Sequence, residues 1–196
     1  MDFISIEGVY RFYTFNDVDW AGKKEDTSTS AHLVFYGRSL ISWKSSKQCA
    51  VARSSTEAEY RSLTTTSAEL TWIRSLLSEL CIQVQHVPTI HCDNLSATYL
   101  SINPVMHSRM KHIAIDVHFL HDLVQQRILQ VQHVSTTDQL ADFLTKPLSR
   151  QRHHLLKTKI SVLDGTPLLR GRVKAMTQHT KINSNPLNHR HLIASN

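Results

Sequence analysis

Apolar positions follow a short period in the first quarter of the chain. Up to residue 54, apolar and aromatic runs alternate with polar, turn-like stretches, a pattern typical of consecutive antiparallel strands. We expect a strand in GVYRFYTFND, a hairpin made by residues 31–37 and 39–45 around Gly37, and a further strand over residues 48–54.

From Ser55 to Ile82 the apolar residues follow a helical period instead. Two overlapping capping boxes are possible at the start of this helix. If Ser54 caps the helix, Glu57 closes the box and Glu59 is left free near the helix start. If Thr56 caps it, Glu59 is only the capping partner.

The remaining apolar segments predict a strand, two helices, a strand and a closing helix. They are VPTIHCDN (87–94), LSATYLSIN (95–103), MKHIAIDVHFLHDLVQQR (110–127), ILQVQHV (128–134) and STTDQLADFLTKPL (135–148). A strand that returns after a helical crossover implies a mixed sheet with helices on its faces. Ligands of such sheets bind outside the carboxyl ends of the strands.

Acidic residues occur where these elements begin or end. Asp17 and Asp19 lie one residue apart at the end of the first strand, so on an extended chain they share one face. A solvated turn and a metal site are both compatible with this pair. Acids on three later elements can meet it at one edge of the sheet: Glu59, Asp93 and Asp142.

Composition excludes several classes of protein. The chain has 196 residues, 41% of them hydrophobic, which suits one domain plus extensions. We expect no membrane span and no signal peptide. The three cysteines have no CxxC spacing, which indicates a reduced intracellular protein in which each cysteine is a small packing residue.

Charge is distributed unevenly along the chain. Residues 1–150 carry 14 Lys and Arg against 15 acids, whereas residues 151–196 carry eight against one. Such a basic tail attracts nucleic acid or acidic surfaces. We expect it to be largely disordered from about Leu163.

Six motifs occur in the order seen in copia-type LTR retrotransposons: DVDWAG, SLISWKSSKQ, SSTEAEYRSL, HCDNLSATYL, HSRMKHIAIDVHF and HVSTTDQLADFLTKPL. Over roughly residues 10–150 the chain resembles the ribonuclease H domain at the end of such an element's Pol polyprotein. The resemblance implies the ribonuclease H fold, a five-stranded mixed sheet flanked by helices. It also implies endonucleolytic hydrolysis of the RNA strand of an RNA–DNA hybrid.

The resemblance assigns metal-binding roles to four carboxylates. Asp19 and Glu57 remain the register alternatives within their respective motifs. The positions that match the family's acids, in chain order, are Asp17, Glu59, Asp93 and Asp142.

Four carboxylates suit two Mg²⁺ or Mn²⁺ ions, because these hard cations prefer oxygen ligands. Two such ions clamp the attacking water and the leaving oxygen of a phosphodiester. Without metal the acids repel one another, so at least one of them should have a raised pKa. His133 lies where the family often has a basic or histidine-bearing loop. It is a candidate for proton transfer or product release, or an ordinary strand-end histidine.

Residues near these acids are candidates for contacts with nucleic acid. Asn94 and Ser96 are placed to donate hydrogen bonds to the 2′-hydroxyl groups of a hybrid, with helix capping as the alternative. Lys111, His112 and Lys146 are candidates for phosphate contacts, although a solvated lysine is the commoner case.

The resemblance also sets expectations for domains and partners. Residues 1–9 are expected to end a connection from an upstream polymerase region, residues 10–150 to form the ribonuclease H-like domain, and residues 151–196 to form the basic tail. The expected partners are an RNA–DNA hybrid and an upstream reverse transcriptase domain, inside the cytoplasm or nucleus. The alternative is an inactive retroelement remnant or a nucleic-acid-binding module without turnover. Four intact acids favour the nuclease, and the missing polymerase region favours the alternative.

Overall fold

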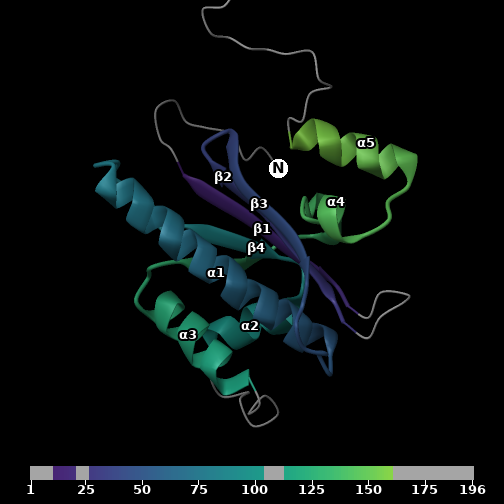
Figure 1. Cartoon of the computed structure of the whole chain (residues 1–196), viewed down its shortest axis with the longest axis horizontal. Helices are drawn as coiled ribbons and strands as arrows, with labels where there is room; N and C mark the ends of the chain where they lie inside the picture. The colour runs from purple at the N-terminus through teal and green to yellow at the C-terminus, as the bar shows by residue number, and fades with distance from the viewer. Residues whose placement is uncertain (1–10, 21–26, 104–112, 161–196) are drawn as a thin grey trace, which may run out of the picture. The chain divides into compact units, whose positions relative to one another are not determined.

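The computed structural model describes residues 11–20, 27–103 and 113–160. Its elements follow the predicted order except that the strand expected over residues 48–54 is missing and two elements are added near the end (Figure 1). They are β1 (Phe12–Asp19), β2 (Thr29–Tyr36), β3 (Ser39–Lys47), α1 (Ser55–Glu79), β4 (Thr89–Cys92), α2 (Leu95–Ile102), α3 (Ala114–Gln125), β5 (Gln130–His133), the 3-10 helix Thr136–Asp138, α4 (Asp142–Thr145) and α5 (Arg150–Lys159).

The strands form one five-stranded mixed sheet in the order β3-β2-β1-β4-β5. Neighbouring strands in β1–β2–β3 are antiparallel, whereas β4 and β5 continue the sheet parallel to β1. The predicted mixed sheet flanked by helices is therefore confirmed. The central position of β1 explains its composition, because a strand buried on both faces needs apolar and aromatic residues on both.

Each face of the sheet has its own hydrophobic core. On one face, Phe12 and Ile90 pack with residues of α1, α2 and α3. On the other, Phe15 and Leu33 pack against Ala141, beside α4, and the end of α5. Figure 1 shows α1 lying across the sheet with α2 and α3 beside it, and α4 next to α5. The alternation of side chains along β1 divides its residues between these two cores.

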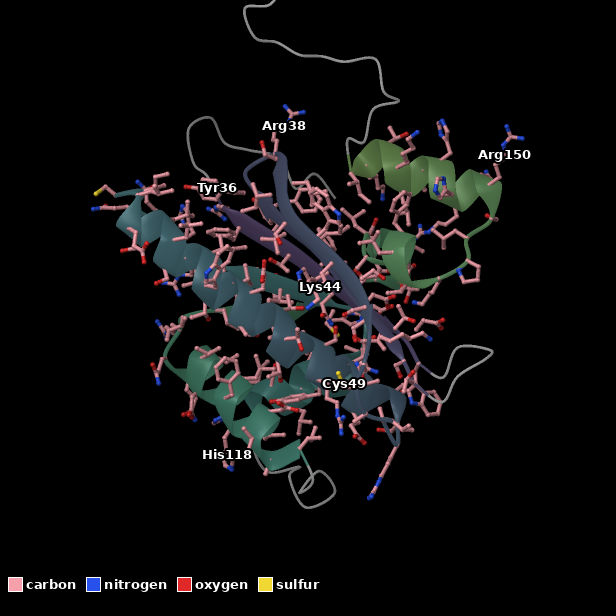
Figure 2. All side chains as sticks on the ribbon, viewed as in Figure 1. Tyr36, Arg38, Lys44, Cys49, His118 and Arg150 are labelled. Carbon is pink, nitrogen blue, oxygen red and sulfur yellow. The ribbon has the colours of Figure 1, made fainter. Side chains whose placement is uncertain are left out.

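The predicted hairpin is β2–β3. Only Gly37 and Arg38 separate the two strands, and Gly37 has a positive φ of 60°. A two-residue hairpin loop that begins at positive φ favours glycine in that position. Figure 2 shows Arg38 at the tip of this hairpin, with Tyr36 at the end of β2.

The strand predicted over residues 48–54 is wrong. β3 ends at Lys47, and the following residues form an irregular connection to α1. Gln48 makes one last ladder bond, from its N–H to the carbonyl of Ser28. Its side chain then donates to Ala58 in α1, at 2.8 Å. The chain then leaves the sheet and leads into the α1 N-cap, Ser54.

Helix α1 begins as one of the two capping boxes predicts. Ser54 is the N-cap and accepts a hydrogen bond from the Glu57 N–H, while Glu57 accepts one from the N–H of Arg53. Glu59 is consequently not used as a capping partner. In the part of the chain that the structure describes, no helix is long and apolar enough to cross a membrane.

Helix α5 was not predicted from the sequence. Ser149 caps it, and its segment RQRHHLLKTK carries basic or polar side chains at most positions. Leu156 inside the helix and Ile160 at its end are nevertheless buried, one turn apart. Two apolar residues are too few to show a helical period by inspection. The disorder predicted from about Leu163 lies outside the described residues.

The cysteines were predicted to be packing residues, and this is correct only for Cys92. Cys92 is buried, whereas Cys49 and Cys81 are exposed. Figure 2 shows Cys49 near the start of α1. The two exposed cysteines lie in connections that follow β3 and α1, where little packs over them.

A candidate metal centre at the ends of β1 and β4

The four acids of the sequence prediction come from four elements that meet at one end of the sheet. Asp17 is near the end of β1, and Asp93 directly follows β4. Asn16 pairs with Cys92 across the parallel strands, so Asp17 and Asp93 are the next residues on each. The other two acids are Glu59, in the second turn of α1, and Asp142, the first residue of α4.

The ligating atoms of these side chains form two overlapping groups. Asp17, Asp93 and Asp142 make one group, and Glu59, Cys92 and Asp93 make the other, with all atoms of a group within 4.8 Å of one another. Asp93 belongs to both. Because it is less buried than Asp17, Glu59 and Asp142, Asp93 lies where the cluster meets solvent.

Glu59 is held by neutral hydrogen-bond donors. Asn16 Nδ2 donates to its Oε2 and the Val18 N–H to its Oε1, both at 3.2 Å. Burial, and then the nearby charges of Asp17 and Asp93, raise the pKa of Glu59 well above its usual value. Without metal, this carboxyl therefore favours its protonated form, as the repulsion argument predicts.

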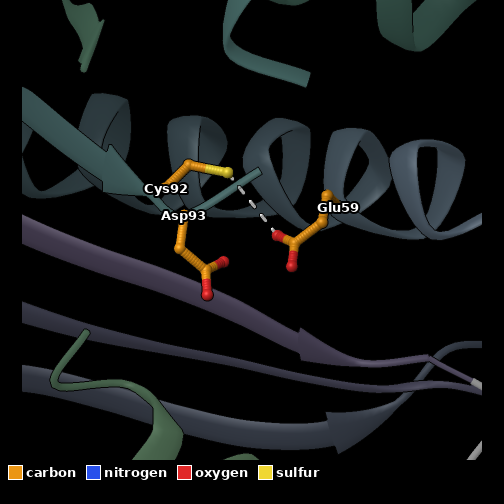
Figure 3. A group of neighbouring side chains, drawn as sticks. All are labelled: Glu59, Cys92 and Asp93. Carbon is orange, nitrogen blue, oxygen red and sulfur yellow. Dashed lines mark hydrogen bonds between the residues drawn. The ribbon is translucent and has the colours of Figure 1, made fainter. Parts of the chain in front are cut away.

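Cys92 adds a sulfur atom to the Glu59 side of the cluster. Its Sγ is 3.7 Å from Glu59 Oε2, and Figure 3 shows both side chains directed toward the same space as Asp93. Burial, and then the charge of Glu59, raise the pKa of this thiol well above its usual value. Among the described residues, neither group of ligating atoms includes a histidine.

Asp17 and Asp142 are in contact with cations. Lys146 Nζ lies 3.0 Å from Asp17 Oδ1 and 2.7 Å from Asp142 Oδ1. Arg152 approaches the second oxygen of Asp142 at 3.4 Å, and the Thr145 hydroxyl donates to the second oxygen of Asp17. Burial still raises the pKa of Asp17, although Lys146 and Thr145 oppose that shift. Burial alone would lower the pKa of Lys146, but the two carboxylates outweigh it and raise that pKa.

The two register alternatives lie outside both groups. Asp19 is the last residue of β1, two positions beyond Asp17. Glu57 binds the Arg53 N–H and forms an ion pair with Arg61 at 2.8 Å. The structure thus brings Asp17 and Glu59 to the cluster, while Glu57 has a structural use at the helix start.

The other predicted site residues lie around this cluster. His133 ends β5, is exposed and pairs in register with Cys92. Asn94 caps α2 by accepting the Ala97 N–H at 2.9 Å, and Ser96 is exposed in the first turn of that helix. Lys111 and His112 lie outside the described residues.

Sequence reasoning missed the polar residues that support the acids. Asn16 is fully buried and accepts hydrogen bonds from Ser62 and Thr66 of α1, at 2.7 and 2.8 Å. Gln139, also fully buried, donates to the Asn16 carbonyl at 2.8 Å and so ties the chain before α4 to β1. Asn16 could have been found from the sequence, because it interrupts an apolar strand and a buried amide needs hydrogen-bond partners.

The donor set fits divalent cations that prefer oxygen. Three carboxylates surround one space, and two carboxylates and a thiol surround the adjoining one. The raised pKa of Glu59 reflects burial first and then repulsion from Asp17 and Asp93, and a cation would relieve that repulsion. On the Asp17 side a cation would first have to replace the Lys146 ammonium group.

Comparison with known proteins identifies relatives along most of the chain. No protein-family model matches the sequence. The chain is 56% identical over 156 residues to the retrovirus-related Pol polyprotein from transposon RE2 of Arabidopsis thaliana. The aligned residues make up 79% of this chain and 11% of that protein. It is 36% identical over 149 residues to the corresponding polyprotein from transposon TNT 1-94 of Nicotiana tabacum, with 76% and 11% covered.

Solved structures show more distant likenesses. The N-terminal RNase H domain of a Mycobacterium tuberculosis protein, determined as a fusion with maltose binding protein, has a TM-score of 0.45 at 10% identity and covers 76% of this chain and 97% of that one. LC11-RNase H1 in complex with an RNA/DNA hybrid has a TM-score of 0.44 at 12% identity, with 69% and 93% covered.

The sequence relatives support the resemblance found in the motifs. The observed sheet is mixed and five-stranded, as the resemblance implied. The chain spans about a tenth of the length of the curated relatives it matches. The chain therefore belongs to the family of retrovirus-related Pol polyproteins from copia-type transposons, and it contributes a domain with a ribonuclease H-like fold.

Proposed function

We propose that this domain hydrolyses the RNA strand of RNA–DNA hybrids endonucleolytically, using two Mg²⁺ or Mn²⁺ ions, during retrotransposon reverse transcription. The observation that carries the proposal is the pair of ligand groups that share Asp93. Two adjoining groups, one of three carboxylates and one of two carboxylates and a thiol, fit a two-ion site better than a single structural ion, which needs one group.

The cations would be held by Asp17, Asp93 and Asp142 on one side and by Glu59 and Asp93 on the other. When bound, such ions polarise the phosphodiester and activate water. Asn16 and the Val18 N–H would keep Glu59 in its orientation, since both already bind its carboxylate. Gln139 would keep the Asp142 segment against β1.

The surrounding residues would recognise the substrate. Asn94 would use its amide nitrogen toward a 2′-hydroxyl, since its oxygen caps α2. The exposed Ser96 would donate from the same helix start, and His133 would transfer a proton or assist product release. For Lys111 and His112 we propose phosphate contacts.

The family membership suggests the wider setting. Because the curated relatives are much longer Pol polyproteins, of which this chain matches about a tenth, an upstream reverse transcriptase domain is the proposed protein partner. Such a role would place the domain inside the cell, in the cytoplasm or nucleus.

A second candidate function is binding of nucleic acid without turnover, as expected of a degenerate element. The position of Lys146 favours this candidate, because its ammonium group already neutralises part of the acid cluster. The basic composition of residues 151–196 is compatible with either function.

Cleavage of an end-labelled RNA–DNA hybrid tests the proposal. We expect the RNA strand to be cut in Mg²⁺, no cleavage in EDTA, and no cleavage of double-stranded DNA. Asp93→Asn should abolish cleavage, whereas Asp122→Asn, on the exposed side of α3, should have no effect. A folded wild-type protein that binds the hybrid but does not cut it in Mg²⁺ or Mn²⁺ would support the second candidate.

A further inference from the structure

Lys146 lies inside the acid cluster. Its Nζ is 3.0 Å from Asp17 Oδ1 and 2.7 Å from Asp142 Oδ1, and both carboxylates are almost fully buried. The lysine side chain itself is 32% exposed. The ammonium group therefore neutralises two buried acids while its own path to solvent stays open.

Helix α4 explains why the lysine is there. Lys146 follows Asp142 by four residues, so the two side chains lie on one side of a single helical turn. The Thr145 hydroxyl donates to the other oxygen of Asp17. Both oxygens of Asp17 are thus occupied by donors from two consecutive residues at the end of α4.

The Glu59 side of the cluster differs. Asn16 and the Val18 N–H donate to Glu59, and Thr136 donates to Asp93 at 3.3 Å. Within the described ranges, neither Glu59 nor Asp93 forms an ion pair with a lysine or arginine. A cation that approaches Glu59 and Asp93 has no ammonium group to displace.

We propose that Lys146 is an internal counter-ion that competes with a divalent cation for Asp17 and Asp142 and thereby sets the order of metal binding. The Glu59–Asp93 side binds its cation first, and the Asp17–Asp142 side binds the second only when the Lys146 ammonium group leaves. The released side chain then presents its positive charge to a substrate phosphate. This inference rests on the proposed function, because it assumes that the acids bind metal.

Competition makes a distinctive prediction about affinity. Loss of a residue that merely supports the fold weakens metal binding, whereas loss of a competitor strengthens it. Lys146→Gln keeps a hydrogen-bond donor near the carboxylates but removes the charge. We therefore expect its weaker Mn²⁺ site to bind about tenfold more tightly than that of the wild type, a coupling typical of contacting charges.

Isothermal titration of the full chain with Mn²⁺ measures this effect. The wild type should show two binding steps of different affinity, and Lys146→Gln should bring the weaker step close to the stronger one. Lys146→Arg, which keeps the charge, should remain like the wild type. Lys159→Gln removes a lysine that pairs with Asp138 on the surface, and it should change neither step.

Three outcomes decide the matter. Tighter binding in Lys146→Gln alone supports the inference. Equal isotherms for wild type and Lys146→Gln overturn it and leave the proposed nuclease function standing. Absence of Mn²⁺ binding in every folded variant overturns both. If Lys146→Gln does not fold, Lys146→Met, which keeps the packing of the aliphatic stem, takes its place.

Discussion

The two sides of the acid cluster solve the same electrostatic problem differently. On one side, neutral donors from Asn16 and Val18 hold Glu59, and no lysine or arginine of the described residues forms an ion pair with it. On the other, Lys146 and Arg152 form ion pairs with Asp142, and Lys146 also pairs with Asp17. One side is preorganised but repulsive, and the other is neutralised.

The difference shows what each side can do without metal. Neutral donors fix the direction of a carboxylate but offset its burial only in part, so burial, and then the charges of Asp17 and Asp93, raise the pKa of Glu59 well above normal. The ammonium group offsets part of the burial of Asp17, at the expense of occupying its oxygens. The Glu59 side therefore offers ready access to a cation, whereas the Asp17 side stabilises the metal-free fold.

The largest expected effect concerns the choice between Glu59 and Glu57. Glu59→Gln should reduce Mg²⁺-dependent cleavage of the hybrid by several orders of magnitude, because it removes a charged oxygen donor from the Glu59 side of the cluster. Glu57→Gln is the matched control two residues away. It should keep the cleavage rate and lose only stability, because it weakens the capping box and the Arg61 ion pair. Equal rate losses in the two variants would contradict this assignment.

The hydrogen bonds of Asn16, which hold Glu59, can be removed without changing any charged residue of the cluster. Asn16→Ala leaves the buried hydroxyls of Ser62 and Thr66 without their acceptor, and it should lower the free energy of unfolding by about 2–4 kcal/mol. Urea denaturation measures the loss. Asn94→Ala, which removes only the α2 cap, should cost about 1 kcal/mol. A similar small cost for both changes would show that the Asn16 network is unimportant.

Asp142 should give an intermediate effect on catalysis. It lies between Lys146 and Arg152, and Asp142→Asn leaves Lys146 paired with Asp17, so the substitution only partly changes the charge of the cluster. We expect cleavage to fall by about ten- to a hundredfold, the range typical of a residue that holds the metal through water rather than directly. Single-turnover cleavage rates measure it, and a loss as large as that of Glu59→Gln would place Asp142 among the essential ligands.

The smallest effect is a pH dependence of stability without metal. Below the ordinary Glu pKa of 4.5, both folded and unfolded chains hold the Glu59 proton. As pH rises above 4.5, the unfolded chain releases this proton and the folded chain retains it, so the contribution of Glu59 to stability falls. In EDTA, Glu59→Gln should therefore gain stability relative to wild type as pH rises toward neutral.

Urea denaturation at several pH values checks this difference. Glu79→Gln, at the exposed end of α1, is the matched control and should follow the wild type at every pH. Saturating Mn²⁺ should reduce the advantage of Glu59→Gln, because metal stabilises only the fold that binds it. An advantage that shrinks as pH rises would contradict the raised pKa of Glu59.

Apart from the false strand over residues 48–54, the order of the elements from β1 to β5 could be predicted because these elements have enough apolar residues to show their periods. The 25-residue α1 and the aromatic β1 are clear examples. The choice between the Ser54 and Thr56 caps could not be made from the sequence, since both fit. The structure selects Ser54 because Glu57 then satisfies the preceding backbone N–H while also pairing with Arg61.

The choice between Asp17 and Asp19 also could not be made from the sequence. Both acids point to the same face, and only pairing with β4 distinguishes them. Asn16 is level with Cys92, so Asp17 is level with Asp93, whereas Asp19 lies two residues, about 7 Å, further along. Register across parallel strands depends on contacts far apart in the chain, which periodicity does not contain.

The Lys146 contact was missed for a different reason. The sequence suggested only a phosphate contact or a solvated side chain for this lysine, because α4 is four residues long and has no recognisable period. Its i, i+4 spacing from Asp142 becomes meaningful only once residues 142–146 are known to be helical and packed on β1. Short helices at the edge of a site are the elements that sequence patterns describe least well.

The central claim is that the carboxylates meeting at Asp93 form the catalytic metal site, and Asp17→Asn against Asp19→Asn tests it most directly. Both substitutions keep the side-chain shape and remove one charge from the same face of β1. The measurement is the Mg²⁺-dependent rate of RNA-strand cleavage in an RNA–DNA hybrid. We predict that Asp17→Asn abolishes cleavage while folding normally, and that Asp19→Asn keeps most of the wild-type rate. Loss of cleavage in Asp19→Asn with activity retained in Asp17→Asn would contradict the account.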